Sequence, residues 1–304
     1  MAISKAAASL LFELKTTQTL EGTICQLGRQ TILVSTHKIR QVAKSFGFDS
    51  KETNEELPWT GNADDVYLFE TLGYKKVESI DADDFENANY VMDLNIDVPY
   101  EFHNRFDAIY DGGTMEHIFN LPQVLKNIHK MLKPGGIIMH LSPSHNHVDH
   151  GFFMFSPTFF YDYYKTNNYE IIRSNILEYS PNPMNTIWKI YNYESLSLEH
   201  LAYGGWDSSM LGIWFVAKKT ILSSDNAIPQ QARYVKVWDN TYKLKSSKSL
   251  INEESILRKL INKLQDSAKR NRISYSFFYF LRNFYFGFKF LFKSNKKPQI
   301  IARY

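Results

Sequence analysis

The stretch FDAIYDGGTMEHIFN places titratable side chains directly behind a short apolar run. The apolar run predicts a buried strand that ends at Asp111, and Gly112 and Gly113 follow it as a turn. Glu116 and His117 come next, on the segment that leaves this turn. A turn does not need an acid–histidine pair, so we interpret these residues as part of a ligand-binding site.

A second group of titratable residues lies in HLSPSHNHVDHGFFMF, which contains His140, His145, His147 and His150. Histidine is the usual general base near neutral pH, and a positioned base contributes roughly 10²–10⁴-fold to a rate. We expect one of His150, His147 and His117 to act as the base. His140 alternates within an apolar run, so we expect it to be structural.

Other interpretations of these histidines remain open. The His-x-His-x-x-His pattern together with Asp149 also suits a divalent metal ion, and the loop could carry no chemistry at all. We assign no metal ion to these residues. For His117 the alternative is a histidine that caps or packs the turn.

Acids also close two other predicted strands. Asp81, in VESIDADD, is placed to accept both hydroxyls of a bound ribose, in charge-assisted bonds of roughly 1.5–3 kcal/mol each. Asp83 is its substitute. Asp93, in MDLN, is placed to bond an adenine amino group, with the backbone of Leu94 beside it. For each acid, the alternative is an aspartate that stabilises a turn.

These residues fall at the ends of short β-rich runs that alternate with helical patterns. We predict strands at 22–28, 75–81, 89–95, 106–111, 136–143, 169–179 and 211–219, and helices near the N-terminus and at 35–48, 62–73, 121–136 and 156–167. Such alternation predicts an α/β fold with a doubly wound, mostly parallel sheet. Ligands bind beyond the carboxyl ends of such strands.

The order of these motifs resembles the class I S-adenosylmethionine-dependent methyltransferases, in a divergent bacterial-type branch. The resemblance runs from about residue 22 to 168 and rests on QLGRQ, SIDADD with MDLN, FDAIYDGGTMEHIFN and LKPGGIIMHLSP. It implies a Rossmann-like fold and S-adenosylmethionine as cofactor. QLGRQ departs from the family pattern, because its second and third glycines are missing.

Carried over residue by residue, the resemblance gives each motif a role. Gly28 would contact the methionine part of the cofactor, and Arg29 or Gln30 would reach its carboxylate. Asp81 would hold the ribose, and Asp93 with Leu94 the adenine. The sulfonium would lie at the edge of Asp111, Gly112 and Gly113, with Glu116 and His117 in the segment that follows.

Charge divides the chain into two parts. The net charge of +3 comes from 35 Lys/Arg and 32 Asp/Glu. From Ser267 onward there are nine Lys/Arg and no acid, which leaves 26 cations against 32 acids before it, a net of −6. An acidic body argues against nucleic acid as a partner. The single cysteine, Cys25, excludes an internal disulfide and fits a reducing compartment.

The C-terminal region is unlike the body. Residues 273–293 contain eleven Phe/Tyr and three cations, a composition that favours the interface of an anionic membrane. Docking on the body or on a second copy is the alternative. We therefore predict a methyltransferase-like domain at 1–220, a linker at 221–251 and a basic, aromatic, helical appendage at 252–304.

Together these features predict an enzyme that methylates an oxygen of a sugar or a cell-envelope glycoconjugate precursor. We expect it to be cytoplasmic, at the inner face of the membrane. Whether it forms an oligomer stays open. The alternative function is a non-catalytic binding or scaffold subunit that kept the fold. A nicotinamide-dependent oxidoreductase fits less well, because G-x-G-x-x-G is absent from the sequence.

Overall fold

The computed structural model describes residues 2–49, 61–180, 182, 186–202, 204–246, 280 and 297–304. The chain divides into two units. The first comprises Met1–Ala202, Trp206–Ala232 and Pro298–Tyr304, and the second Tyr203–Gly205 and Arg233–Lys297. The first unit carries the sheet and all the candidate site residues. The second carries nearly all of helix α6 (Ala232–Ser246).

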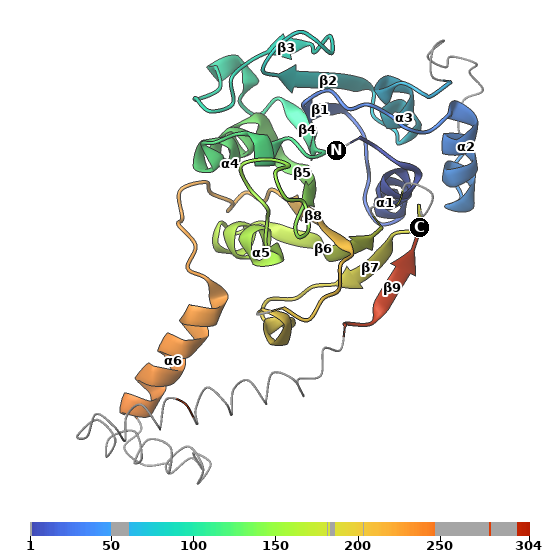
Figure 1. Cartoon of the computed structure of the whole chain (residues 1–304). Helices are drawn as coiled ribbons and strands as arrows, with labels where there is room; N and C mark the ends of the chain where they lie inside the picture. Colours follow the sequence, from blue (N-terminus) through green and yellow to red (C-terminus); the bar gives the residue numbers. More distant parts are fainter. Residues whose placement is uncertain are drawn as a thin grey trace. The chain divides into compact units, whose positions relative to one another are not determined.

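One sheet has the strand order β3-β2-β1-β4-β5-β8-β6-β7-β9 (Figure 1). Its strands are β1 (Thr23–Leu27), β2 (Lys76–Asp81), β3 (Tyr90–Val91), β4 (Phe106–Asp111), β5 (Leu132–Pro143), β6 (Glu170–Tyr179), β7 (Lys189–Asn192), β8 (Met210–Lys218) and β9 (Ile300–Arg303). Five neighbouring strands, β3, β2, β1, β4 and β5 in sheet order, pair in parallel. Strands β8 and β7 each pair antiparallel to both of their neighbours. All described strands except β8 and β7 therefore run the same way, which confirms the predicted Rossmann-like, mostly parallel sheet.

The helices form where the sequence offers caps. They are α1 (Lys5–Lys15), α2 (Thr36–Ser45), α3 (Asp65–Thr71), α4 (Leu121–Met131), α5 (Pro157–Thr166) and α6, with short 3-10 turns η1 (Tyr100–Phe102), η2 (Met115–His117) and η3 (Glu199–Leu201). Ser35 and Asp64 act as N-caps, because their side chains accept hydrogen bonds from backbone amides of α2 and α3. The five helices that we predicted before residue 170 are confirmed.

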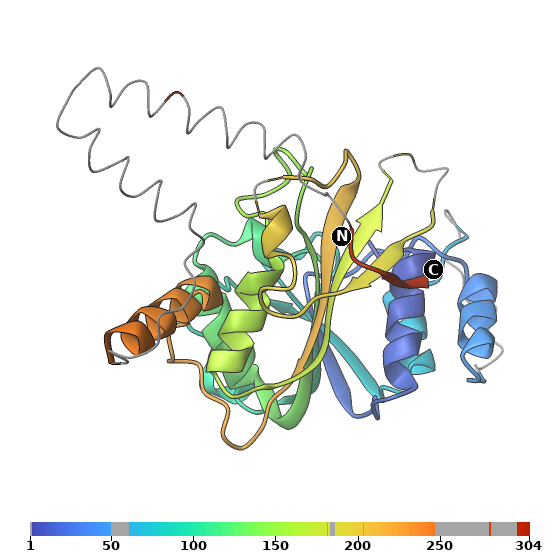
Figure 2. The ribbon, with the colours of Figure 1, turned by 90° about the horizontal axis from the view of Figure 1, so that it is seen from below.

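Helices cover both faces of the sheet (Figure 2). Side chains alternate along a strand, so each strand contributes to two cores. In β4, Ala108 and Tyr110 belong to the core that contains α1, α2 and α3, whereas Ile109 belongs to the core that contains α4 and α5. The two cores hold the parallel strands in place, and with them the loops at their carboxyl ends.

Three boundaries differ from the sequence prediction. Helix α4 ends at Met131 rather than near residue 136, and β5 already begins at Leu132, because Pro134 favours an extended conformation in the residue before it. Helix α6 lies within the predicted linker. Ile300–Arg303 is a strand paired with β7, although we predicted a helical appendage there.

Other predictions concern residues that the structure does not describe. Apart from Phe280, the aromatic segment 273–293 lies outside the described residues. The division into domain, linker and appendage stays a prediction. None of the helices in the described ranges has the length and apolarity needed to cross a membrane.

Candidate active site

A pocket of about 360 Å³ opens where β1, β2 and β4 end. We call it the strand-end pocket. These strands are parallel neighbours, so their carboxyl ends meet at one edge of the sheet. The volume falls within the range of small-molecule sites, roughly 300–1,000 Å³. The lining residues are Ala2, Gly28, Arg29, Gln30, Thr31, Asp81, Glu86, Gly113, Thr114 and His117.

Gly28 is the point where the backbone comes closest to this pocket. Its φ of +67° lies in the left-handed region, and a Cβ atom there would lie 2.6 Å from Oγ1 of Thr114. The hydroxyl of Thr114 donates a hydrogen bond to the Leu27 carbonyl. Sequence reasoning missed Thr114, because only the parallel pairing of β1 with β4 brings it beside the first loop.

Asp81 occupies the position predicted for the ribose acid. Its Oδ2 accepts a hydrogen bond from the Arg29 amide at 3.2 Å, and its Oδ1 accepts one from the Ala82 amide at 2.7 Å. Each carboxylate oxygen has a second lone pair, so the half-buried group can still accept hydroxyl donors from the pocket. Asp83, its substitute, is exposed and accepts a bond from the Phe85 amide in a turn.

The loop after β1 is held by polar side chains where a nucleotide-binding turn would normally have several glycines. The Arg29 guanidinium forms an ion pair with Asp65 at 3.0 Å, so this side chain is already engaged within the protein. Asp65 also accepts a bond of 2.6 Å from Gln26, whose Oε1 accepts the Gln30 amide. These bonds stiffen the loop.

Gln30 lines the same pocket and has an unused acceptor. Its Nε2 donates to the carbonyls of Leu27 and Gly28. Its Oε1 is buried and accepts no hydrogen bond from the part of the chain that the structure describes. This oxygen lies against Gly112, which is not part of the pocket lining. The pocket therefore fits a ligand with hydroxyl donors, which the Asp81 carboxylate can accept.

Asp111 and Gly112 lie inside the fold, not in the lining of the pocket. The buried carboxylate of Asp111 accepts hydrogen bonds from the Thr114 and Met115 amides and lies 2.7 Å from Nδ1 of His140. The other ring nitrogen of His140 is 2.7 Å from the Tyr164 hydroxyl, so His140 is structural, as predicted. Asp111 thus fixes the turn that presents the residues after it.

Asp93 and Leu94 also lie outside the lining of the pocket. Asp93 is exposed and accepts hydrogen bonds from the backbone and side-chain amides of Asn95. These bonds lower the pKa of its carboxyl group. Leu94 is buried, and its carbonyl accepts a bond from Asn127. The predicted contact of these residues with adenine stays a prediction.

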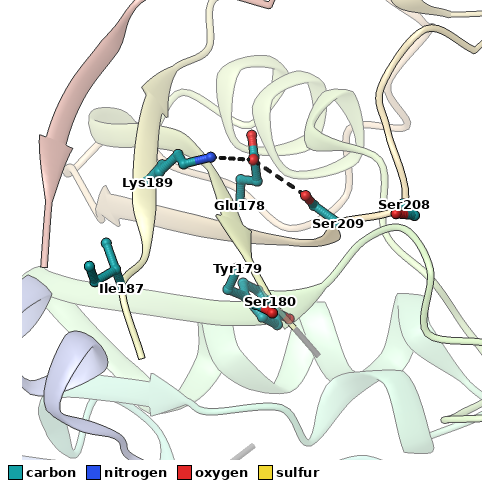
Figure 3. A pocket seen from close by; sticks show the side chains of 7 residues that line it. All are labelled: Glu178, Tyr179, Ser180, Ile187, Lys189, Ser208 and Ser209. Atoms are coloured by element: carbon teal, nitrogen blue, oxygen red, sulfur yellow. Dashed lines mark hydrogen bonds and ion pairs between the residues drawn. The ribbon is translucent and has the colours of Figure 1, made fainter. Parts of the chain in front are cut away.

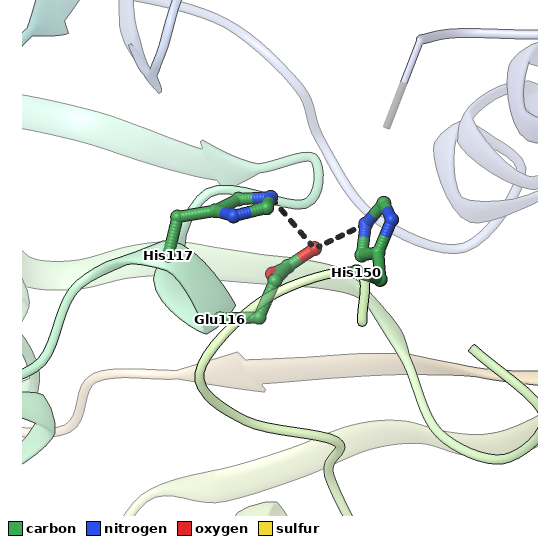
Figure 4. A group of neighbouring side chains, drawn as sticks. All are labelled: Glu116, His117 and His150. Atoms are coloured by element: carbon green, nitrogen blue, oxygen red, sulfur yellow. Dashed lines mark ion pairs between the residues drawn. The ribbon is translucent and has the colours of Figure 1, made fainter. Parts of the chain in front are cut away.

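Glu116, His117 and His150 meet in one cluster, which we call the Glu116 cluster (Figure 4). Oε1 of Glu116 lies 3.6 Å from Nε2 of His150 and 4.0 Å from Nε2 of His117. The Glu116 side chain is 0% exposed, and neither carboxylate oxygen has a hydrogen-bond partner among the described residues. Burial, and then the nearby Asp111 carboxylate, raise the pKa of Glu116 to about 8.

The loop that carries His150 is fitted closely to Glu116. The Phe153 amide donates to the Glu116 carbonyl at 3.2 Å. A Cβ atom on Gly151 would lie 2.9 Å from that same carbonyl, so a glycine is needed for this approach. Asp149 has a φ of 62°, which turns the chain just before His150. The fold thus brings together His117 and His150, which are 33 positions apart in the chain.

A row of rings leads away from the cluster. The ring centroids of His117 and His150 are 5.2 Å apart, those of His150 and His147 5.6 Å, and those of His147 and Tyr179 5.8 Å. His147 is buried, and its Nε2 lies 2.8 Å from the Tyr179 hydroxyl. Burial, followed by the neighbouring His150, lowers the pKa of both His117 and His147.

Tyr179 lines a second hollow of about 250 Å³, which we call the polar hollow (Figure 3). Glu178 accepts a 2.8 Å bond from Lys189 and a 3.3 Å bond from Ser209 within it. The hollow lies where β6 ends and β7 and β8 begin, which is the same edge of the sheet as the strand-end pocket. Its lining residues are Glu178, Tyr179, Ser180, Ile187, Lys189, Ser208 and Ser209.

Comparisons with known proteins give the following matches. Residues 75–140 match the family model described as a methyltransferase domain. No curated protein matches the chain. The 1,6-didemethyltoxoflavin-N1-methyltransferase of Burkholderia thailandensis, solved with S-adenosylhomocysteine, is 11% identical, with a TM-score of 0.36 over 71% of this chain and 78% of its own. A SAM-dependent methyltransferase from Aquifex aeolicus is 11% identical, with a TM-score of 0.34 over 67% of this chain and 87% of its own.

The doubly wound sheet, with its pocket at the carboxyl ends of β1, β2 and β4, defines a Rossmann-like α/β protein. The family match covers the chain from just before β2 into β5. It includes Asp81, the turn after β4, and Glu116 with His117. Residues 75–140 carry a methyltransferase domain, as the resemblance to the divergent class I S-adenosylmethionine-dependent methyltransferases implied. The protein is an enzyme, a methyltransferase whose cofactor is S-adenosylmethionine.

Proposed function

We propose that this enzyme methylates a hydroxyl oxygen of a sugar or of a cell-envelope glycoconjugate precursor. The observation that carries the proposal is the Glu116 cluster, which adjoins the strand-end pocket through His117. A hydroxyl is a poor nucleophile until it loses its proton, so an enzyme that methylates oxygen needs a proton acceptor beside the methyl donor. Two imidazoles and a carboxyl group supply that acceptor.

S-adenosylmethionine supplies an electrophilic methyl group on a sulfonium. In our proposal, Gly28 lets the backbone approach the cofactor, and Asp81 accepts its ribose hydroxyls. The Asp111 network fixes the turn beside them. Holding the acceptor oxygen in line with the methyl group provides much of the rate, because proximity removes an entropic barrier.

The proton of the acceptor leaves at the Glu116 cluster. Among its members, His150 is our first candidate for the proton acceptor, because its Nε2 is closer to the Glu116 carboxylate than that of His117. A carboxyl group beside an imidazole stabilises the charge that the imidazole gains. His147 is less suited to direct contact with an acceptor, since it is buried and bonded to Tyr179.

Two surfaces next to the cluster support a sugar acceptor. The exposed rings of Phe119 and Phe152 lie with their centroids 5.5 Å apart, and exposed aromatic rings beside a site are a common means of ligand contact. A pyranose ring has an apolar face that can stack on such rings. The polar hollow, reached through His147 and Tyr179, offers hydroxyl and charged groups to the remainder of the acceptor.

Labelled cofactor tests this proposal. The full chain would be incubated with methyl-labelled S-adenosylmethionine and a bacterial extract separated into polar sugars, lipid-linked glycans, nucleic acid and protein. We expect label in a glycan fraction, stable to conditions that cleave methyl esters, and absent with His150→Ala. Label confined to protein or nucleic acid would contradict the proposed acceptor class.

We further propose that the enzyme works at the cytoplasmic face of an anionic membrane, through residues 273–293. Rings favour the headgroup region, and each cation near such a surface contributes about 1 kcal/mol. The full chain should co-sediment with anionic vesicles, and the triple variant Arg282→Gln, Lys289→Gln, Lys293→Gln should do so less. Truncation is unsuitable, because it removes β9 from the sheet. Equal sedimentation of both proteins would contradict this proposal.

A further inference from the structure

We propose that Glu116, His117 and His150 bind a divalent transition-metal ion. This set differs from the His145, His147 and His150 pattern that the sequence offers, because it takes its carboxylate and one imidazole from the turn after β4. The structure brings the two segments together at η2 and at the loop after β5. Figure 4 shows both imidazole rings beside the Glu116 carboxylate.

The spacing of the donor atoms suits one ion. The three ligand atoms lie within 4.8 Å of one another. Metal–ligand bonds of about 2.0–2.2 Å place neighbouring ligand atoms about 3–4 Å apart. Oε1 of Glu116 is 3.6 Å from Nε2 of His150 and 4.0 Å from Nε2 of His117, so small side-chain rotations are enough to close the set around an ion.

The burial of Glu116 is the second observation that points to a ligand. Its side chain is 0% exposed, and its two oxygens have no hydrogen-bond donor in the described ranges of the chain. Buried carboxylates are normally paired, hydrogen-bonded or bound to a metal. His117 and His150 are 49% and 38% exposed, so an ion can reach the carboxylate from solvent between them.

The donor types indicate which ions fit. Two imidazoles and one carboxylate suit Zn²⁺, Fe²⁺, Co²⁺ or Mn²⁺, whereas Mg²⁺ and Ca²⁺ prefer sites made of oxygen atoms. Three protein ligands also leave coordination positions open, as catalytic metal sites do. An acceptor oxygen could occupy an open position beside the strand-end pocket, which His117 lines.

The role of the ion rests on the proposed function, although its binding does not. A hydroxyl bound to the ion would ionise more readily. Its O–H bond breaks as the proton passes to water, the new bond forms between that oxygen and the methyl carbon, and the carbon–sulfur bond breaks to leave S-adenosylhomocysteine. With the ion bound, His150 is a metal ligand and not the proton acceptor. A chelator distinguishes these two roles, because it stops methyl transfer only if the ion takes part in it.

Titration with Co²⁺ tests the site directly. Metal-free, tag-free full-length protein would be titrated by calorimetry and by the visible absorption of Co²⁺. We expect one ion per chain and at least tenfold weaker binding by Glu116→Gln, which keeps the shape of the side chain. His145→Gln is the matched control, since it removes an exposed histidine of the same loop that is not in the cluster. It should bind like the wild type.

Folding and function have separate controls. Glu116→Gln should keep its affinity for S-adenosylhomocysteine, which shows that the variant is folded, and Co²⁺ should raise the Tm of the wild type more than that of the variant. Equal Co²⁺ binding by wild type and Glu116→Gln would overturn the site. Tight, Glu116-dependent binding in a protein that transfers no methyl group would support the site and contradict the proposed function. Methyl transfer unaffected by a chelator that removes the ion would overturn the role given to the ion.

Discussion

Two carboxylates five residues apart, Asp111 and Glu116, are both 0% exposed and yet have opposite surroundings. Asp111 accepts bonds from two amides and lies 2.7 Å from His140. The Glu116 carboxylate has no hydrogen bond within the described chain, and its nearest basic atom is 3.6 Å away. A satisfied buried network stabilises a fold, whereas an unsatisfied group costs stability and is expected at functional sites. The first carboxylate builds the site, and the second is available for chemistry.

Removing Asp111 should have the largest effect on folding. We expect Asp111→Ala to lower the free energy of unfolding by roughly 3–5 kcal/mol, because it leaves Nδ1 of His140 and two amides without their buried partner. Urea denaturation measures this value. Asp93→Ala is the control, since it removes an exposed turn acid and should cost less than about 1 kcal/mol. If both variants lose the same stability, Asp111 does not have the structural role described above.

A substitution in the Glu116 cluster should lower the turnover rate and leave the fold intact. We expect His150→Ala to lower turnover by roughly 10²-fold or more, since the group that activates the acceptor is lost. Its affinity for S-adenosylhomocysteine should stay near that of the wild type. Steady-state kinetics and calorimetry measure the two quantities, with His145→Ala as control. Wild-type turnover in His150→Ala would remove His150 from the mechanism and make His147 or His117 the candidate.

A third carboxylate, Asp81, combines features of the other two, because it is bonded to two amides and still lines the pocket. We expect Asp81→Ala to weaken S-adenosylhomocysteine binding about tenfold, or about 1.4 kcal/mol, through the loss of a charge-assisted bond. Calorimetry measures the change. Asp83→Ala should bind like the wild type, and the opposite order would transfer the ribose contact to Asp83.

The last prediction concerns how the stability of the metal-free protein depends on pH. The pKa of Glu116 is about 8 in the folded chain and 4.5 as its ordinary value. Between these values the unfolded chain binds fewer protons than the folded chain, so the free energy of unfolding falls as the pH rises. This contribution is complete below pH 4.5 and is lost as the pH approaches 8.

Glu116→Gln removes that dependence. We expect the variant to be more stable than the wild type at pH 8, with the difference shrinking toward pH 5. Urea denaturation in the presence of a chelator, at several pH values, checks the sign. If the variant is less stable at pH 8, Glu116 has a partner in solution, and the contrast with Asp111 disappears.

Much of the fold followed from the sequence, because its signals are local. Alternating apolar runs marked the strands that end at Leu27, Asp81 and Asp111, and polar caps marked the helices. The rule that parallel strands share one edge predicts that Gly28 and Asp81 lie at the same site, and both line the strand-end pocket. Boundaries shifted where a single residue decided them, as Pro134 did for α4.

Tertiary structure decided what those residues do. Asp111 and Glu116 look equivalent in the sequence, but the packing of β4 against β5 gives His140 to the first, and the loop that carries His150 reaches the second. Thr114 enters the pocket through the pairing of β1 with β4, which local patterns do not encode. The sequence by itself thus determined which groups stand at the edge of the sheet. Only the folded chain determined which are satisfied and which are free for chemistry, because hydrogen-bond partners come from residues distant in sequence.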